Sequence, residues 1–235
     1  MRLAGAIAYD IKLQYRHGFY YAYLVISAFY VVLLRFLPAS VRETADILLT
    51  FTDPSMLGFF FIGGLVLLEK GQDIHNTLFV TPYKPEEYIL SKTLSLTILS
   101  AISSYLIHIS EFGFTTNPLL FMLGVVLTSV FFTFAGMGVA FRCRSLNGFF
   151  FLSTMVTFVF LLPISGFLDI WSTPLYYVLP TQGSFILLRS AFEQIPASQI
   201  LYAVLLLAGW GGLAFLWTRV SFRKFIMLRM GGDGP

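Results

Sequence analysis

Few residues of this apolar sequence have side chains that could do chemistry. The histidines are His17, His75 and His108, and their spacing matches neither HExxH nor HxxxH, so a metal-assisted hydrolase would lack its ligands. His108 and Glu111 could form a proton or cation site, because ionisable groups within apolar segments are functional by default. Both lie near the end of an apolar stretch, so we expect them to be solvated there rather than to form a site.

The remaining motifs fit neither an intramembrane protease nor a nucleotide-binding protein. Glu86 and Glu87 match the first positions of EExxxR, a motif of CAAX-type membrane proteases, but Ser91 stands where the arginine belongs. The PISGF stretch at 163–167 lacks the first glycine of a GxSG motif. No GxxxxGK(S/T) phosphate loop is present, and the glycine pairs lie in apolar stretches without a lysine to meet phosphate. We therefore expect a protein that is not an enzyme.

Composition indicates an integral membrane protein. Hydrophobic residues make up 57% of the 235 positions and charged residues 11%, with a mean hydropathy of +0.80, whereas soluble domains average about 25% charged residues. The single cysteine, Cys143, excludes an intrachain disulfide and a CxxC pair. The chain has room for several membrane spans with short connections, and we predict one transmembrane domain over 1–235.

Six apolar stretches are long enough to cross a bilayer, which needs about 20 mostly apolar residues. They cover 19–37, 51–68, 88–109, 119–141, 148–171 and 200–220. Pro163 falls inside the fifth stretch, so we expect a kink or break between 161 and 166. The predicted fold is an all-α polytopic membrane protein with six transmembrane helices.

The distribution of lysine and arginine predicts the orientation, because positively charged flanks stay on the cytoplasmic side. With both termini in the cytoplasm, only Arg35, Arg42 and Arg189 of the 15 lysines and arginines lie outside. We therefore place the chain in the cell membrane with cytoplasmic N- and C-termini. The net charge of +3 follows from this bias and requires no nucleic-acid partner.

Two parts outside the spans have their own character. Within 1–18, Leu3, Ile7, Ile11 and Tyr15 recur every four residues with the basic residues largely off that stripe, which predicts an amphipathic helix at the membrane interface. The segment 168–199 contains aromatic residues and apolar turns too short to span. We predict that it forms outer re-entrant helices, because tryptophan and tyrosine are enriched at membrane interfaces.

The polar segment 69–84 separates the second and third stretches. Glu69 to Val80 can form a helix interrupted only by Gly71, and Pro82 and Pro85 end it. Joining two spans needs only about 2–8 residues, so a longer polar segment indicates a function. An apolar edge bordered by polar side chains is typical of a docking surface.

This segment resembles the coupling-helix loop in the permease subunits of type-2 ATP-binding-cassette (ABC) exporters. The matching positions are Glu69, Gly71, Pro82, Tyr88, Leu90 and Lys92. YDIKLQYRHGFYYAY is similar to the basic interface helix before span one, and LPISGFLDIWSTPLYYVLPTQGSFILLRSAF to the outer re-entrant region between spans five and six. The pattern also resembles small drug-export permeases, including those that export fluoroquinolones.

The resemblance implies a transport subunit that carries no cofactor of its own. ATP and Mg would be bound by two separate ABC ATPase subunits, and the permease would pair with a second copy of itself or a related permease in the lipid bilayer. ATP binding would move the coupling helix and shift spans two and three between inward and outward states. The substrate would be a small hydrophobic or amphipathic molecule, a drug being one example.

Candidate site residues fall into two groups. The residues expected to couple to the ATPase are Glu69, Gly71, Asp73, Ile74, His75, Leu78 and Phe79. In the related family spans two and five line the dimer seam, so the residues expected along the substrate pathway are Phe59, Phe60, Phe61, Thr154, Met155 and Phe158. Aromatic and soft apolar side chains with one hydroxyl suit an amphipathic solute. Phenylalanine side chains are equally common on helix surfaces that only contact lipid.

Two other classes of protein remain open at this point. An ion-gradient-driven carrier with six spans would need paired charges near the middle of the membrane, and the six stretches have few charges away from their ends. A membrane anchor or assembly factor without transport activity would explain the cytoplasmic helix and would need no pathway.

Overall fold

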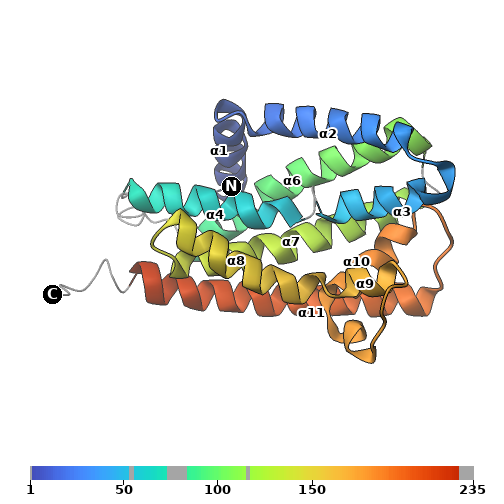
Figure 1. Cartoon of the computed structure of the whole chain (residues 1–235). Helices are drawn as coiled ribbons and strands as arrows, with labels where there is room; N and C mark the ends of the chain where they lie inside the picture. Colours follow the sequence, from blue (N-terminus) through green and yellow to red (C-terminus); the bar gives the residue numbers. More distant parts are fainter. Residues whose placement is uncertain (1, 53–55, 73–83, 115–116, 228–235) are drawn as a thin grey trace.

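The computed structural model describes residues 2–52, 56–72, 84–114 and 117–227, and these residues are almost entirely helical (Figure 1). Most of the helices run side by side between two ends of the molecule, while α1 crosses them. At one end, called here the basal end, α4 finishes and α6 begins. The opposite end carries α3 and is called the α3 end.

The N-terminal part forms four helices. They are α1 (Arg2–Arg16), α2 (Phe19–Phe36), α3 (Ala39–Thr50) and α4 (Met56–Gly71). Gly18 joins α1 to α2 with φ of 79°, a left-handed conformation that glycine adopts without a steric penalty. Pro38 caps the start of α3, where its missing N–H costs nothing. Helix α3 was not predicted from the sequence.

The remaining elements complete the bundle. They are α6 (Pro85–Phe112), α7 (Pro118–Arg142), α8 (Leu146–Leu161), α9 (Pro163–Phe167), the 3-10 turn η2 (Pro174–Val178), α10 (Pro180–Arg189), α11 (Ala197–Phe222) and the π turn η3 (Arg223–Met227). The predicted break near Pro163 is confirmed, since α8 ends at Leu161 and α9 starts at Pro163. Within 168–199 the chain forms the short elements η2 and α10; their insertion into a membrane stays a prediction.

Helix α7 is the centre of the packing, and α2 lies at the edge. In the most apolar window of each helix, 61% of α7 is buried but only 17% of α2. Gly136 lets α7 approach α4 closely, because a Cβ there would lie 2.3 Å from the backbone oxygen of Phe59. Small residues at helix contacts bring backbones together in this way.

Five helical segments of the described residues have the length and composition to cross a membrane. They are Phe19–Phe36, Pro85–Phe112, Pro118–Arg142, Leu146–Phe167 and Ala197–Met227. Of the predicted span 51–68, residues 51 and 52 directly follow α3 and residues 56–68 belong to α4, which has 16 described residues and is not one of these five segments. The count of six spans is therefore not confirmed.

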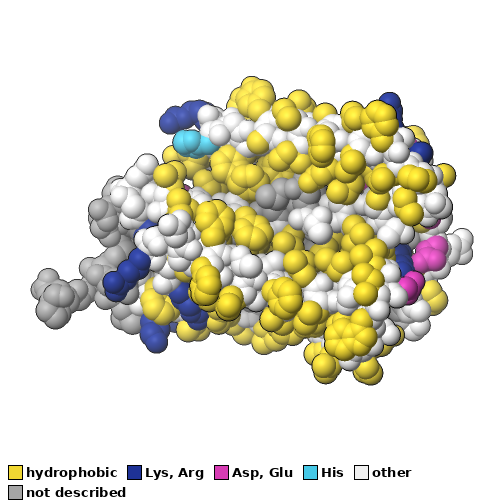
Figure 2. All heavy atoms as spheres, in the orientation of Figure 1, with side chains coloured by type: hydrophobic (Ala, Val, Ile, Leu, Met, Phe, Trp, Pro, Cys, Tyr) yellow, Lys and Arg dark blue, Asp and Glu magenta, His cyan; other side chains and the backbone are white. Residues whose placement is uncertain are grey.

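The surface is that of a membrane protein. Figure 2 shows hydrophobic side chains over most of the visible face, with Lys and Arg at the basal end and both signs of charge at the α3 end. Large apolar side chains are exposed along α2 and α8, among them Leu24, Phe29, Phe36, Phe151 and Phe158. Exposed apolar side chains of this kind are stable in a bilayer, because they contact apolar lipid tails instead of water.

Candidate functional site

Four polar side chains meet in the interior at the basal end and are called here the Lys92 cluster: Asp10, Glu69, Tyr88 and Lys92. The Lys92 Nζ lies 2.6 Å from Glu69 Oε1 and 3.3 Å from Asp10 Oδ1. The Tyr88 hydroxyl donates to the other oxygen of Glu69. All four side chains are buried, so each charge depends on its partners rather than on water. The cluster therefore ties α1, α4 and α6 together.

The same face of α1 makes a second polar contact with α6. The Gln14 side-chain amide donates to the Ser95 hydroxyl at 2.7 Å. Asp10 and Gln14 lie four residues apart, and their partners Lys92 and Ser95 lie three apart, so both pairs follow the helical repeat. Asp10 was not among the site residues predicted from the sequence. The available signal was a carboxylate three residues after Ile7, beside the apolar stripe.

The start of α6 is anchored on both sides. The backbone N–H of Lys84 donates to the Glu87 carboxylate at 3.0 Å, and carboxylates in the first turn complement the helix dipole. Glu86 forms an ion pair with Arg219 of α11 at 2.7 Å. The Tyr88 ring packs against Phe141 and Phe222. This end of α6 is therefore held by α7 and α11 as well as by the Lys92 cluster.

The end of α4 is anchored as well. The Lys70 ammonium donates to the carbonyl oxygens of Phe141 and Cys143, both at 2.9 Å, which are at the end of α7. Glu69, the preceding residue, belongs to the Lys92 cluster. Both flanks of the segment between Gln72 and Lys84 are thus fixed by buried or partly buried polar contacts.

The predicted coupling residues divide into two sets. Glu69 and Gly71 lie in the last turn of α4 rather than in a separate helix. Glu69 was expected to offer polar contacts to a partner, but its side chain is buried because Lys92 and Tyr88 hold its carboxylate. The remaining predicted residues lie outside the described part of the chain: Asp73, Ile74, His75, Leu78 and Phe79.

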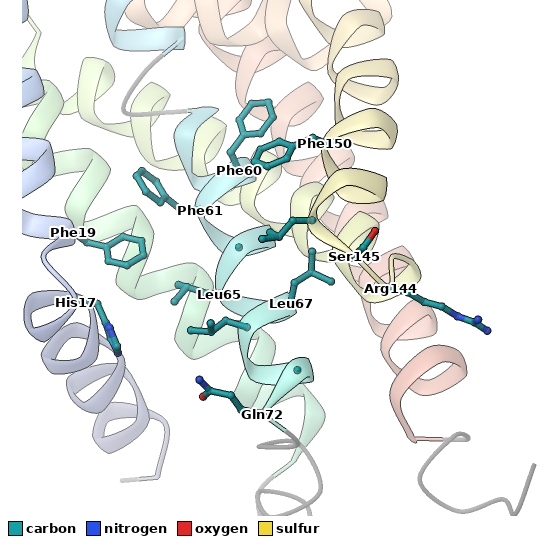
Figure 3. Close-up of a pocket in the computed structure, with 14 residues that line it drawn as sticks. His17, Phe19, Phe60, Phe61, Leu65, Leu67, Gln72, Arg144, Ser145 and Phe150 are labelled. Carbon is teal, nitrogen blue, oxygen red and sulfur yellow. The ribbon is translucent and has the colours of Figure 1, made fainter.

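A groove of about 780 Å³ opens on the side of α4, toward α2 and α8 (Figure 3). Its walls are mainly apolar, and four phenylalanines contribute: Phe19, Phe60, Phe61 and Phe150. Polar residues occur near its basal end, where His17, Gln72 and Ser145 lie. A large apolar hollow with few polar groups is the usual form of a site for a small organic molecule.

The predicted pathway residues lie in three different places. Phe60 and Phe61 line the groove, and the Phe61 ring lies 4.8 Å from that of Phe19, centroid to centroid. Phe59 is buried, and its ring packs against that of Phe149 in the core rather than lining the groove. Three residues are on the exposed face of α8 outside the groove: Thr154, Met155 and Phe158. Phe150, one turn before Thr154, is the residue of α8 that reaches the groove.

The α3 end contains a second group of buried charges, contrary to the expectation of a solvated His108 and Glu111. His108 is 1% exposed and bonded through Nδ1 to Asp46 of α3, which is fully buried. The Glu111 side chain, also buried, accepts from Arg42 at 2.7 Å and from Arg35 at 3.4 Å. The expectation was wrong because α3, which was not predicted, covers this part of α6.

Five apolar helical segments of membrane length among the described residues, with a mainly apolar groove along α4, define a polytopic membrane protein. A family model described as the fluoroquinolones export permease protein family matches residues 1–230, and the chain belongs to this family. Two similar relatives are the fluoroquinolones export permease proteins of Mycobacterium tuberculosis strains CDC 1551 / Oshkosh and ATCC 25618 / H37Rv. Each is 28% identical over 207 residues, which cover 86% of this chain and 87% of the relative.

Proposed function

We propose that this chain is the membrane subunit of an ATP-driven exporter that moves hydrophobic or amphipathic molecules out of the cell. Two separate ABC ATPase subunits would bind ATP and Mg, and a second permease would complete the complex. The chain would cross the membrane six times, because α4 would form a span in addition to the five segments of membrane length. Both termini would lie in the cytoplasm. The family membership is the observation that carries the proposal.

The anchored flanks of the segment 72–84 support a coupling role for it. A force applied to this segment reaches α4 through Glu69 and Lys70 and reaches α6 through Lys84 and Lys92. Because Lys92 pairs with Glu69, the two helices would move together rather than separately. Asp10 extends the same rigid unit to α1. Packed helices joined in this way shift as bodies between discrete arrangements.

The side chains that line the groove would suit a planar, partly apolar substrate. Its phenylalanine rings offer flat apolar contacts, and the polar side chains at its basal end can accept or donate hydrogen bonds. The relatives are named for fluoroquinolones, which makes this class the first substrate to test. A second permease placed against α2 and α8 would close the open side of the groove.

The ATPase partnership is tested by purification from native membranes. The variant Ile74→Asp with Leu78→Asp places two charges on the predicted docking surface, and we expect an ATPase to copurify with the wild type but not with this variant. Val41→Asp with Phe114→Asp is the matched control, because both residues are exposed apolar positions near the α3 end. The control should retain the ATPase, and each protein should remain monodisperse in size-exclusion chromatography.

Two results would contradict this proposal. If no ATPase copurifies with the wild type, the exporter assignment fails and an ion-gradient-driven carrier becomes the better account. If the control loses the ATPase as completely as the docking variant, the partner does not bind through the segment 72–84.

The groove is tested by filling it. Gly64 lines the groove and a Cβ there would meet nothing within 4 Å, so Gly64→Leu should fold and occupy the space. Gly212→Leu is the control, because Gly212 is equally open but lies in a different apolar hollow between α7 and α11. Cells that express Gly64→Leu with the ATPase should accumulate a fluoroquinolone, whereas the control should not. Equal accumulation in both would exclude this groove as the pathway.

A further inference from the structure

Asp46 and His108 form a buried pair that the export proposal does not use. The Asp46 Oδ2 lies 2.6 Å from the His108 Nδ1, and the two side chains are 0% and 1% exposed. The pair joins α3 to the last turns of α6, and α3 is not among the candidate membrane spans. A titratable pair this well enclosed cannot exchange a proton with water unless the surrounding helices separate.

Three phenylalanine rings surround the imidazole and are called here the aromatic box: Phe112, Phe121 and Phe192. Their centroids lie 5.4, 5.0 and 5.2 Å from that of His108. The Phe112 ring is stacked on the imidazole at an interplanar angle of 23°. The box adds α7 and the segment after α10 to the contact between α3 and α6.

Two atoms of the pair lack a hydrogen-bond partner among the described residues. They are His108 Nε2 and Asp46 Oδ1. A bare Nε2 in an apolar box is a buried acceptor with nothing to accept from, which costs free energy. An imidazolium here would give the buried Asp46 carboxylate a counter-charge, since Asp46 Oδ2 lies 2.6 Å from His108 Nδ1.

The other charged groups near the pair largely neutralise one another. Glu111 faces Asp46 from α6, but Arg42 of α3 and Arg35 of α2 both bind Glu111. The charged residues nearest Phe192 point elsewhere, since Arg189 lies over the ring of Phe167 and Glu193 is exposed. Arg42 and Glu111 form a neutral pair and the Arg35 side chain is 65% exposed to solvent, so an ionised Asp46 beside a neutral imidazole has no buried counter-charge.

We propose that the Asp46–His108 pair is a proton-binding site whose bound proton holds the α3 end closed. With the proton, the pair is neutral overall and α3 stays against α6, α7 and the segment after α10. When these elements separate, water reaches the pair and the proton leaves to the solvent. The proposal rests on the contacts of this pair and is independent of the proposed export function.

The pH dependence of stability follows from this proton. Burial raises the pKa of Asp46 above its ordinary value, with hydrogen bonding to His108 opposing and Glu111 adding to the rise. The folded protein thus holds a proton that the unfolded chain gives up more readily. This contribution to stability is present at acidic pH and is lost as the pH rises through the titration of the pair.

Thermal unfolding of the full chain in lipid nanodiscs tests the proposal from about pH 5 to about pH 8.5. The wild type should lose stability as the pH rises, and His108→Gln should lose most of that pH dependence, because its amide can still bond Asp46 but cannot take up a proton. Ser104→Ala is the matched control: Ser104 is buried one turn away on α6, and its hydroxyl lacks a partner among the described residues. The control should keep the wild-type slope. Parallel slopes for the wild type and His108→Gln would overturn the proposal.

A second measurement covers the case in which His108→Gln does not fold. His17→Gln with His75→Gln leaves His108 as the sole histidine and does not touch the pair. NMR of its ring nitrogens should show protons on both at about pH 5, even though the side chain is buried. Asp46→Asn in this background should move the loss of the second proton to lower pH, because the cation loses its counter-charge. A bare Nε2 at about pH 5 would show a purely structural histidine and overturn the proposal.

Discussion

The two ends of α6 both bury charged side chains, but they do so in different ways. At the basal end, Lys92 is shared between two carboxylates from α1 and α4, and a tyrosine supplies a further hydrogen bond. At the α3 end, the fully buried pair is Asp46 with His108, and the arginines that bind Glu111 reach the surface, being 29% and 65% exposed. At the basal end, the permanent charge of Lys92 holds the helices together. At the α3 end, the contact between helices depends on the proton bound by the Asp46–His108 pair.

This difference suits the two ends to different tasks. Lysine keeps its charge across the physiological pH range, so the Lys92 cluster joins α1, α4 and α6 under all conditions in a cell. Histidine is the side chain whose charge changes between about pH 5 and 8, so a contact built on it can be weakened by pH. A rigid basal end and a separable α3 end are consistent with motion that starts at the segment 72–84.

The largest effect is expected from Lys92→Met, which leaves Glu69 and Asp10 buried without their cation. Removing one partner of a buried ion pair costs about 3–5 kcal/mol of unfolding free energy, and we expect a large loss of thermal stability and of protein yield. Adding Glu69→Gln should recover part of the loss, because one unpaired charge disappears. A cost below about 1 kcal/mol for Lys92→Met would mean that the cluster is hydrated.

Tyr88→Phe tests the tyrosine of the same cluster with a smaller change. It keeps the ring against Phe141 and Phe222 and removes only the hydroxyl that donates to Glu69. A hydrogen bond to a charged group is worth about 1.5–3 kcal/mol, so denaturant unfolding should show a loss in this range. If the loss equals that of Lys92→Met, the ring and not the hydrogen bond is being disturbed.

At the α3 end, Arg42→Met and Arg35→Met should differ from each other. Arg42 binds Glu111 at 2.7 Å and also the Leu37 carbonyl at the turn between α2 and α3, so its loss should cost about 1 kcal/mol. Arg35 is mostly exposed and lies 3.4 Å from Glu111, so its loss should cost at most about 0.5 kcal/mol. Thermal unfolding of both variants side by side measures the difference. The reverse order would show that the surface arginine carries the contact.

A small effect is also expected between the two ends, at Ser103→Ala. Ser103 and Ser27 share a hydrogen bond of 2.6 Å that links α6 to α2 away from both charge clusters. Hydrogen bonds between membrane helices average about 0.6 kcal/mol, so unfolding in detergent should change by about this amount. A cost similar to that of Tyr88→Phe would show that polar contacts stabilise α6 evenly along its length, and the contrast between its ends would disappear.

Several features could be predicted from the sequence because they depend on local physical properties. The first, third and fourth apolar stretches appear close to their predicted bounds, since an apolar run of membrane length forms a helix whatever surrounds it. The break at Pro163 follows from the missing N–H of one residue. Helix α3 was missed because ASVRETADILLT mixes charged and apolar residues without a long apolar run.

The candidate site was predicted less completely, because its contacts join residues far apart in the chain. Glu69, Tyr88 and Lys92 were recognised individually from a motif, but nothing local indicates that Asp10 of α1 completes their ion pairs. Phe60 and Phe61 reach the groove while the adjacent Phe59 is in the core, and three neighbouring phenylalanines look alike in the sequence. His108 looked solvated because its cover comes from a helix some sixty residues earlier.

By itself, the sequence determined that this is an all-helical membrane protein, where most of its spans lie, and that a polar segment separates α4 from α6. These properties follow from composition, from the length of the apolar stretches and from the positions of prolines. Each of these depends only on residues that are close together in the sequence. Only the tertiary structure decided which charges are buried and with which partners. A side chain's exposure and its counter-charge depend on the helices packed around it, and those helices come from distant parts of the chain.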